Sequence, residues 1–221
     1  MLPALSHVDT WIFDLDNTLY PARANLFAAI DARMTAFVAD LLDLDPVAAR
    51  RIQKEYFIDH GTTLSGLMAD HDIDPHAFLS YVHDIEMDVL EENAPLAAHI
   101  ATLPGRKLVF TNGDKPYALK VLDRLGLGAS FEAVHDIHAM DLSPKPAASA
   151  YAGLCAAYDI DPRAALFVED MARNLRPAKA IGMTTVWIDN GSEQDRDADR
   201  SYVDYRIDDL TLWLDHILES A

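Results

Sequence analysis

Three short stretches of the chain are almost wholly apolar and are rich in β-branched and aromatic residues. They are TWIF at 10–13, KLVF at 107–110 and ALFV at 165–168. Apolar runs of this length without alternating polar residues are typical of strands that are covered on both faces, as in parallel sheets. TTVWID at 184–189 is a fourth candidate strand. The pattern therefore predicts a buried parallel sheet.

Helical patterns follow the second and third of these runs. One covers residues 115–125 and closes with LGLG, and the other covers 174–181 and closes at Gly182, just before the fourth candidate strand. The repeated order of strand, polar turn and helix predicts an α/β fold with a doubly wound, Rossmann-like parallel sheet. In such a sheet the ligand site lies at the carboxyl ends of the strands. We expect a last helix at 209–218.

The segment 21–103 breaks this alternation because it contains no convincing strand. Apolar residues recur at spacings of three and four over 25–42, 46–58 and 75–90, which predicts amphipathic helices. We therefore expect an all-helical domain at 21–103, inserted into an α/β core domain made of residues 1–20 and 104–221. The acidic stretch at 191–201 is expected to be a surface loop.

The charge balance narrows the possible partners. The chain has 36 Asp and Glu against 18 Lys and Arg, a formal net charge of −18 at pH 7, which disfavours nucleic acid and anionic membranes. No apolar run reaches the roughly 20 residues of a membrane span, and the start lacks the pattern of a secretory signal. The single cysteine, Cys155, permits no disulfide within the chain. We expect a soluble, cytoplasmic protein, whose oligomeric state stays open.

Two aspartates follow the first apolar run directly. Residues i and i+2 of a strand share a face, so Asp14 and Asp16 would project in similar directions from the edge of the core. Their mutual repulsion favours protonation of one of them unless a cation lies between them. Aspartates also cap helices at such positions, so this pair alone fits either interpretation.

Polar residues follow the other runs as well. Thr111 and Asn112 can donate hydrogen bonds to a phosphate at a helix start, or can cap that helix. Lys145 lies between two prolines in SPKP, which offers its ammonium group from a stiff loop. Glu169 and Asp170 are hard oxygen ligands of the kind that suits Mg²⁺ together with a substrate phosphate. Motifs that converge at one sheet edge predict a phosphoryl-transfer site.

DLDNT, TN, PKP and ED, in this order, resemble the four signature motifs of the haloacid dehalogenase-like (HAD) superfamily of hydrolases. The helical insertion resembles the C1-type cap domain of that superfamily. The resemblance implies that Asp14 is the nucleophile and Asp16 the general acid and base. It also implies that Thr111 binds the phosphate and that Lys145 neutralises its charge.

The resemblance also implies a metal site. Asp14, Asp170 and the backbone carbonyl of Asp16 would hold Mg²⁺, and Glu169 would support the ion through water. The dehalogenases of this superfamily lack the second aspartate and need no metal, so Asp16 indicates phosphate esters as substrates. Arg173, which follows the ED motif, is expected to pair with a nearby acid.

Within the superfamily, LDNTLYP at 15–21 and HGTTLSGL at 60–67 resemble the pyrimidine 5′-nucleotidase branch. This implies that the substrate is a small phosphorylated metabolite, a pyrimidine nucleoside 5′-monophosphate, with His60, Thr62 and Thr63 facing the base from the cap. The same residues can instead form a turn between two helices, capped by Gly61 and Thr62. The chain departs from the branch at His60, where a tyrosine is expected, and at GD, 113–114.

Other functions fit parts of the pattern. A sugar-phosphate phosphatase or a phosphomutase of the same superfamily would use the same motifs. A phospho-acceptor signalling domain also combines an acid pair, an acceptor aspartate, a threonine and a lysine, but its acid pair follows the first strand and its acceptor a later one. The order here is the reverse. A protein that retains the fold without chemistry is disfavoured because all six residues of catalytic type are present.

Overall fold

The computed structural model describes residues 3–191 and 199–219, and the acidic stretch expected to be a surface loop lies largely outside these residues. The described residues form a six-stranded sheet of order β3-β2-β1-β4-β5-β6, in which every neighbouring pair is parallel. The strands are β1 (Thr10–Phe13), β2 (Arg106–Phe110), β3 (Ala133–His135), β4 (Ala165–Glu169), β5 (Thr184–Ile188) and β6 (Tyr205–Ile207). This order confirms the predicted doubly wound α/β fold.

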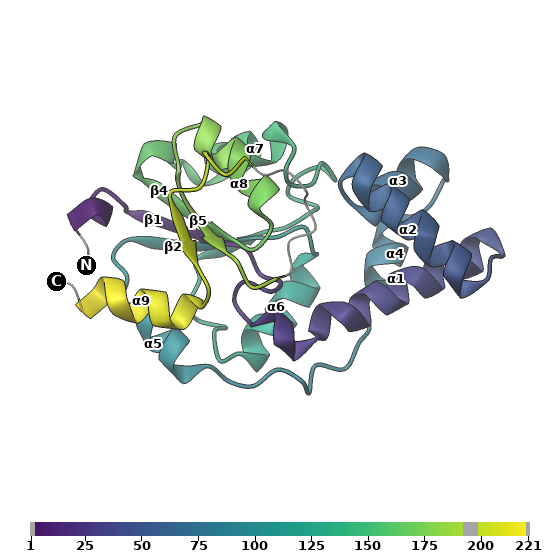
Figure 1. Cartoon of the computed structure of the whole chain (residues 1–221), viewed down its shortest axis with the longest axis horizontal. Helices are drawn as coiled ribbons and strands as arrows, with labels where there is room; N and C mark the ends of the chain where they lie inside the picture. Colours follow the sequence, from purple (N-terminus) through teal and green to yellow (C-terminus); the bar gives the residue numbers. More distant parts are fainter. Residues whose placement is uncertain (1–2, 192–198, 220–221) are drawn as a thin grey trace.

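Helices cover both faces of the sheet. Figure 1 shows α7 (Ala148–Tyr158) and α8 (Ala172–Ala180) on one face, and α5 (Ala94–Thr102), α6 (Lys115–Arg124) and α9 (Leu210–Glu219) on the other. The two central strands, β1 and β4, are buried at every residue. Burial from both sides explains why the runs TWIF and ALFV contain no alternating polar positions.

The two edge strands, β3 and β6, were not predicted. Each has three residues, with the sequences AVH and YRI. Such short segments carry no periodic signal, because their place in the sheet comes from backbone pairing with β2 and β5. They extend the sheet on either side of the four predicted strands, and the carbonyl of His135 on β3 accepts from the N–H of Thr111 at 3.1 Å.

Residues between β1 and α5 form a helical unit. It consists of α1 (Leu26–Leu42), α2 (Pro46–His60), α3 (Thr63–Asp70) and α4 (Pro75–Val82), and is called the α1–α4 unit below. Figure 1 shows it beside the sheet rather than over either face. Asp45 caps α2 by accepting from the N–H groups of Val47 and Ala48. Across residues 3–191 and 199–219, no helix has both the length and the apolarity needed to cross a lipid bilayer.

The helix predicted at 75–90 ends at Val82. The next residue, His83, stacks on the ring of Tyr117 with centroids 4.2 Å apart, and its Nδ1 lies 3.0 Å from Oδ1 of Asp114. Met87 and Leu90 are buried, although they lie in an irregular segment. Their helical spacing therefore reflects burial against the core, and the contacts of His83 end the helix.

Helix α5 packs against α9. Asn93 caps α5 through the N–H of Leu96, and its Nδ2 donates to Oγ1 of Thr211 just inside α9. Leu96 and Ile100 are buried. We therefore propose that the core domain resumes before α5 rather than after residue 103.

Candidate active site

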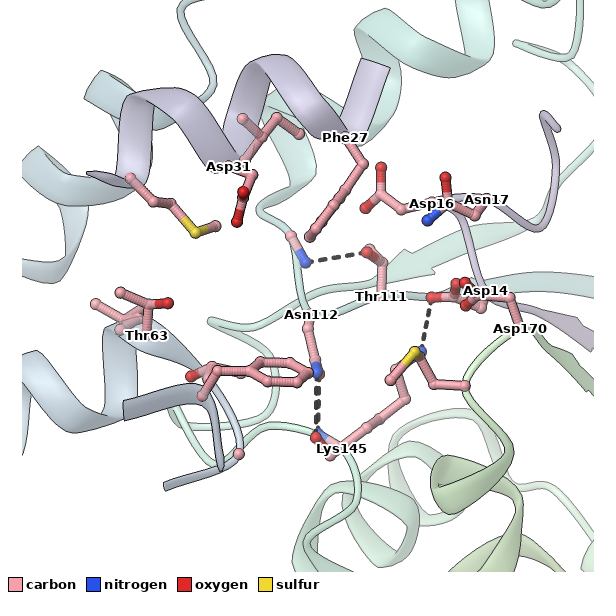
Figure 2. A pocket seen from close by; sticks show the side chains of 18 of the residues that line it. Asp14, Asp16, Asn17, Phe27, Asp31, Thr63, Thr111, Asn112, Lys145 and Asp170 are labelled. Atoms are coloured by element: carbon pink, nitrogen blue, oxygen red, sulfur yellow. Dashed lines mark hydrogen bonds and ion pairs between the residues drawn. The ribbon is translucent and has the colours of Figure 1, made fainter. Parts of the chain in front are cut away.

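The residues that follow β1, β2 and β4 meet at one end of a cavity of about 490 Å³. Figure 2 shows Asp14, Thr111, Lys145 and Asp170 gathered there, while Phe27, Asp31 and Thr63 of the α1–α4 unit line the other side. From β1 the chain adds β2 and β3 toward one edge of the sheet, and from β4 it adds β5 and β6 toward the other edge. The point where this direction changes lies between the neighbouring strands β1 and β4. Parallel sheets bind ligands at this position because the flanking loops separate there.

Lys145 connects the acids of this site. Its Nζ donates to Oδ1 of Asp14, to Oε2 of Glu169 and to the carbonyl of Phe110, each at 2.7 Å. Lys145 and Glu169 are each 1% exposed. Burial lowers the pKa of Lys145, but the charges of Asp14 and Glu169 outweigh this effect and raise it above its usual value. The ammonium group therefore stays charged.

Asp14 is held at the end of β1 by its neighbours. Its N–H donates to the carbonyl of Val168 on β4 at 2.9 Å, and Oγ1 of Thr18 donates to its Oδ2 at 3.2 Å. Burial raises the pKa of Asp14 to about 7, and the charge of Glu169 adds to this effect, while Lys145 opposes it. Burial therefore disfavours the charged form of Asp14 more than the ammonium group of Lys145 favours it.

Asp14, Glu169 and Asp170 can hold a metal ion. They are buried, and each offers a carboxylate oxygen within 4.8 Å of the others. Three carboxylates and one ammonium group leave two negative charges in excess, which a divalent cation with oxygen ligands would neutralise. The indole of Trp187 donates to the main-chain oxygen of Asp170 at 2.9 Å, which orients that residue. The residues present therefore fit Mg²⁺.

Thr111 and Asn112 have different partners. Oγ1 of Thr111 accepts from the N–H of Gly113 at 3.0 Å, which directs its own proton elsewhere. Both ends of the Asn112 amide bond to the main chain of Lys145, Oδ1 to the N–H at 2.8 Å and Nδ2 to the carbonyl at 3.1 Å. Asn112 therefore holds the loop that carries Lys145.

Asp16 has two tyrosine partners that the sequence interpretation missed. The hydroxyls of Tyr20 and Tyr117 each donate to its Oδ1 at 2.6 Å. Burial raises the pKa of both phenols well above the usual value, and the charge of Asp16 adds to the effect, so both remain donors. Tyr20 lies four residues after Asp16 in LDNTLY, a local signal, whereas Tyr117 comes from α6.

The three residues expected to face the substrate from the cap are placed differently. His60 ends α2, is exposed, and does not line the cavity. Thr62 lines the cavity and also caps α3, since its Oγ1 accepts from the N–H of Ser65 at 3.0 Å. Thr63 is buried and lines the cavity. Thr62 therefore forms the capped turn that was the alternative interpretation, and both Thr62 and Thr63 lie at the cavity wall.

A polar cluster in the α1–α4 unit was not foreseen. Oδ1 of Asp31 accepts from Nε2 of Gln53 and Nζ of Lys54, and its Oδ2 accepts from Arg50, all at 2.7 Å. Asp31, Gln53 and Lys54 line the cavity. Figure 2 shows Asp31 across the cavity from Asp14. A signal was present, because Asp31 follows Phe27 by four positions in α1 and so shares its cavity-lining face.

Arg173 connects the core to the α1–α4 unit. One of its terminal nitrogens donates to the carbonyl of Gly61 at 3.2 Å, and its guanidinium lies 4.3 Å from the ring centroid of Phe57. These contacts join Arg173 to α2 and the turn after it, while the expected pairing with a nearby acid stays a prediction. Both Phe57 and Arg173 line the cavity.

Comparison with known families agrees with this geometry. A protein-family model described as a haloacid dehalogenase-like hydrolase matches residues 8–182. The chain belongs to this family. This haloacid dehalogenase-like hydrolase is 25% identical over 196 residues to Phosphate metabolism protein 8 of Saccharomyces cerevisiae. The match covers 78% of the chain and 59% of the yeast protein.

Solved structures of other proteins share the fold of this haloacid dehalogenase-like hydrolase. A predicted phosphoglycolate phosphatase from Haemophilus somnus has a TM-score of 0.66 at 18% identity, and the match covers 98% of this chain and 99% of that one. A HAD phosphatase from Thermococcus onnurineus has a TM-score of 0.61 at 21% identity, with coverage of 96% and 98%. The putative HAD-hydrolase YfnB of Bacillus subtilis, bound to magnesium, has a TM-score of 0.62 at 15% identity, with coverage of 96% and 98%.

Proposed function

We propose that this hydrolase is a Mg²⁺-dependent phosphomonoester hydrolase that acts through an aspartyl-phosphate intermediate on a small phosphorylated metabolite. The observation that carries the proposal is the buried group of Asp14, Glu169 and Asp170, with carboxylate oxygens within 4.8 Å of one another and Lys145 bonded to two of them. The magnesium in the Bacillus subtilis structure supports the choice of metal.

The residues divide the reaction between them. The Asp14 carboxylate attacks phosphorus, and the bond from phosphorus to the ester oxygen breaks as Asp16 donates a proton to that oxygen. Lys145 and Thr111 balance the charge on the phosphoryl oxygens. A water molecule then attacks the aspartyl phosphate, Asp16 takes its proton, and the Asp14 carboxylate is restored. When bound, Mg²⁺ supplies positive charge that lets a carboxylate approach a phosphate dianion.

We propose a pyrimidine nucleoside 5′-monophosphate as the substrate, with the α1–α4 unit acting as a C1-type cap. The cavity, at about 490 Å³, is of the size that small-molecule sites have. Phe27 and Phe57 line it, and aromatic walls suit a stacked base. The carboxylate of Asp31, which lines the cavity, offers an acceptor for the polar edge of that base, and Gln53 holds this carboxylate in place.

A phosphate-release screen tests the proposal. Purified protein is assayed with para-nitrophenyl phosphate, pyrimidine and purine nucleoside monophosphates, sugar phosphates and phosphoglycolate, with Mg²⁺ or with EDTA. We expect release with Mg²⁺, loss of release in EDTA, and the highest kcat/KM for pyrimidine nucleotides. Asp14→Asn should lower kcat at least about 1,000-fold, because it removes the nucleophile.

Asp40→Asn, an exposed change on α1, is the matched control and should retain full activity. Activity that survives Asp14→Asn, or that is unaffected by EDTA, would exclude the mechanism. Release from sugar phosphates alone would retain the mechanism and overturn the nucleotide assignment. Conversion of a sugar phosphate into its isomer, without phosphate release, would indicate a phosphomutase.

A further inference from the structure

Two buried tyrosines bind one oxygen of Asp16. The hydroxyls of Tyr20 and Tyr117 both donate to Oδ1, each at 2.6 Å. The side chains are only 2% and 1% exposed. Tyr20 belongs to the segment after β1, and Tyr117 to the first turn of α6. Asp16 is thus held from two directions, by residues that are far apart in the sequence.

These contacts constrain the carboxyl group. Distances of 2.6 Å lie at the short end of the range for hydrogen bonds between a hydroxyl and a carboxyl oxygen. Two such bonds to one oxygen fix the rotation of the carboxyl plane and fill the hydrogen-bonding positions of Oδ1. Oδ2 is then the oxygen left to exchange a proton at the cavity, which Asp16 lines together with Asp14.

Tyr117 is itself held by residues around it. Its N–H donates to Oδ1 of Asp114 at 3.1 Å, and its ring is stacked on His83 with centroids 4.2 Å apart and planes 12° apart. His83 also lies 3.0 Å from that same oxygen of Asp114. His83 is the first residue after α4. The position of the Tyr117 hydroxyl therefore depends on the segment that leaves the α1–α4 unit.

We infer that Tyr20 and Tyr117 are positioning residues that present Oδ2 of Asp16 to the reacting oxygens. The inference rests on the proposed function. As the bond from phosphorus to the ester oxygen breaks, the proton on Oδ2 moves to that oxygen, and the alcohol leaves neutral. In the second step the bond from Asp14 to phosphorus breaks while the water oxygen bonds to phosphorus, and the proton of that water returns to Oδ2.

The leaving group discriminates between positioning and simple packing. A nitrophenolate leaves as a stable anion and needs no proton, whereas an alkoxide requires one in the transition state. The value of kcat/KM reports the first chemical step and is independent of the later attack by water. A tyrosine that only fills the core would affect both kinds of ester equally. A tyrosine that positions Asp16 would affect the alkyl ester selectively.

The experiment compares Tyr20→Phe and Tyr117→Phe with the unaltered protein on para-nitrophenyl phosphate and on an alkyl phosphate that the unaltered protein hydrolyses. For each variant we expect kcat/KM to fall about 10- to 100-fold on the alkyl ester and less than about threefold on the aryl ester, from the usual size of general acid catalysis. The thermal midpoint of each variant is measured first, and if one variant does not fold, the other decides the question.

Tyr151→Phe is the matched control. Tyr151 is equally buried, and its hydroxyl donates to the carbonyl of Asn174 instead of to Asp16. Its removal should leave the ratio of the two kcat/KM values unchanged. Equal losses on both esters in the Tyr20 and Tyr117 variants, or no loss on the alkyl ester, would overturn the inference and leave the proposed function intact. Absence of phosphate release by the unaltered protein would overturn both.

Discussion

Lys145 holds the acids of the site together, in addition to the neutralisation of phosphate charge that we propose for it. Its three ammonium protons go to Asp14, Glu169 and the carbonyl of Phe110. Lys145 is only 1% exposed, so solvent contributes little to stabilising its charge. Buried charges that lose a partner are strongly destabilising, since no solvent replaces the lost interaction. Lys145 therefore has a structural role that is separable from catalysis.

Lys145→Met removes the ammonium group and keeps most of the volume of the side chain. In EDTA at neutral pH we expect the free energy of unfolding to fall by about 3–5 kcal/mol, because two buried carboxylates lose their cation. Denaturant unfolding measures this change. Lys120→Met, an exposed change on α6, is the control, and its free energy of unfolding should stay within about 0.5 kcal/mol of that of the unaltered protein. A loss for Lys145→Met no larger than that of the control would contradict the structural role.

Helices α2 and α3 approach each other closely at Gly66. A Cβ atom built on Gly66 would lie 2.3 Å from Cγ of Tyr56 and 2.5 Å from its Cβ. These atoms are close to the backbone of α2 and cannot move without shifting the helix. The glycine therefore sets the distance between two helices of the α1–α4 unit, and with it the position of Thr62 and Thr63 at the cavity wall.

Gly66→Ala should lower the free energy of unfolding by about 1–3 kcal/mol, the usual effect of overpacking. Gly153→Ala is the matched control, because Gly153 also lies in a helix, and its added Cβ would meet nothing closer than Nε2 of His135 at 4.0 Å. In the Gly153→Ala control the free energy of unfolding should rise by about 0.5–1 kcal/mol, because alanine favours the helix more than glycine does. Denaturant unfolding of both variants measures these changes. If the free energy of unfolding changed in the same direction in both variants, the spacing role of Gly66 would be contradicted.

The degree of burial of each element explains which elements could be predicted from sequence. Strands β1, β2, β4 and β5 were confirmed because continuous burial leaves a run of apolar residues. The edge strands β3 and β6 have no such run, since their existence depends on pairing. The predicted helix at 75–90 was too long because His83 leaves it to contact Tyr117 and Asp114. A periodic pattern records burial, and burial does not require a helix.

The arrangement of the core and the α1–α4 unit depends on a few contacts between them. Arg173 donates to Gly61 and lies over Phe57. The rings of His76 on α4 and His138 after β3 are stacked, with centroids 4.3 Å apart. Arg173, Phe57 and Gly61 also line the cavity, whose walls come from both parts of the chain. Substrate affinity should therefore depend on residues that never touch the phosphate.

Arg173→Ala removes one hydrogen bond and one cation–π contact between the two parts. Without these contacts, a smaller fraction of the molecules should hold the α1–α4 unit against the core around the cavity. The apparent affinity for substrate should fall in proportion to that fraction. We expect KM to rise about five- to tenfold, with a smaller change in kcat, from the usual strength of such contacts. Steady-state kinetics on the best substrate of the screen measures both constants.

Arg176→Ala is the control on the same helix. Arg176 is exposed, forms a 4.0 Å ion pair with Asp199 and lies over the ring of Tyr202, away from the cavity lining. Its KM should match that of the unaltered protein, since exposed ion pairs contribute little. An unchanged KM in Arg173→Ala would show that the contacts with Gly61 and Phe57 do not control binding.

The sequence by itself determined the fold class and predicted that Asp14, Glu169 and Asp170 lie at one edge of the sheet. Asp14, Glu169 and Asp170 follow buried runs directly, and parallel strands bring their carboxyl ends to one edge, so local periodicity was enough to place them. Only the tertiary structure decided the partners of these residues. Tyr117 reaches Asp16 across 101 positions of the chain, and Arg173 contacts Gly61 across 112. Such contacts depend on how separate elements pack, which the periodicity of one element does not contain.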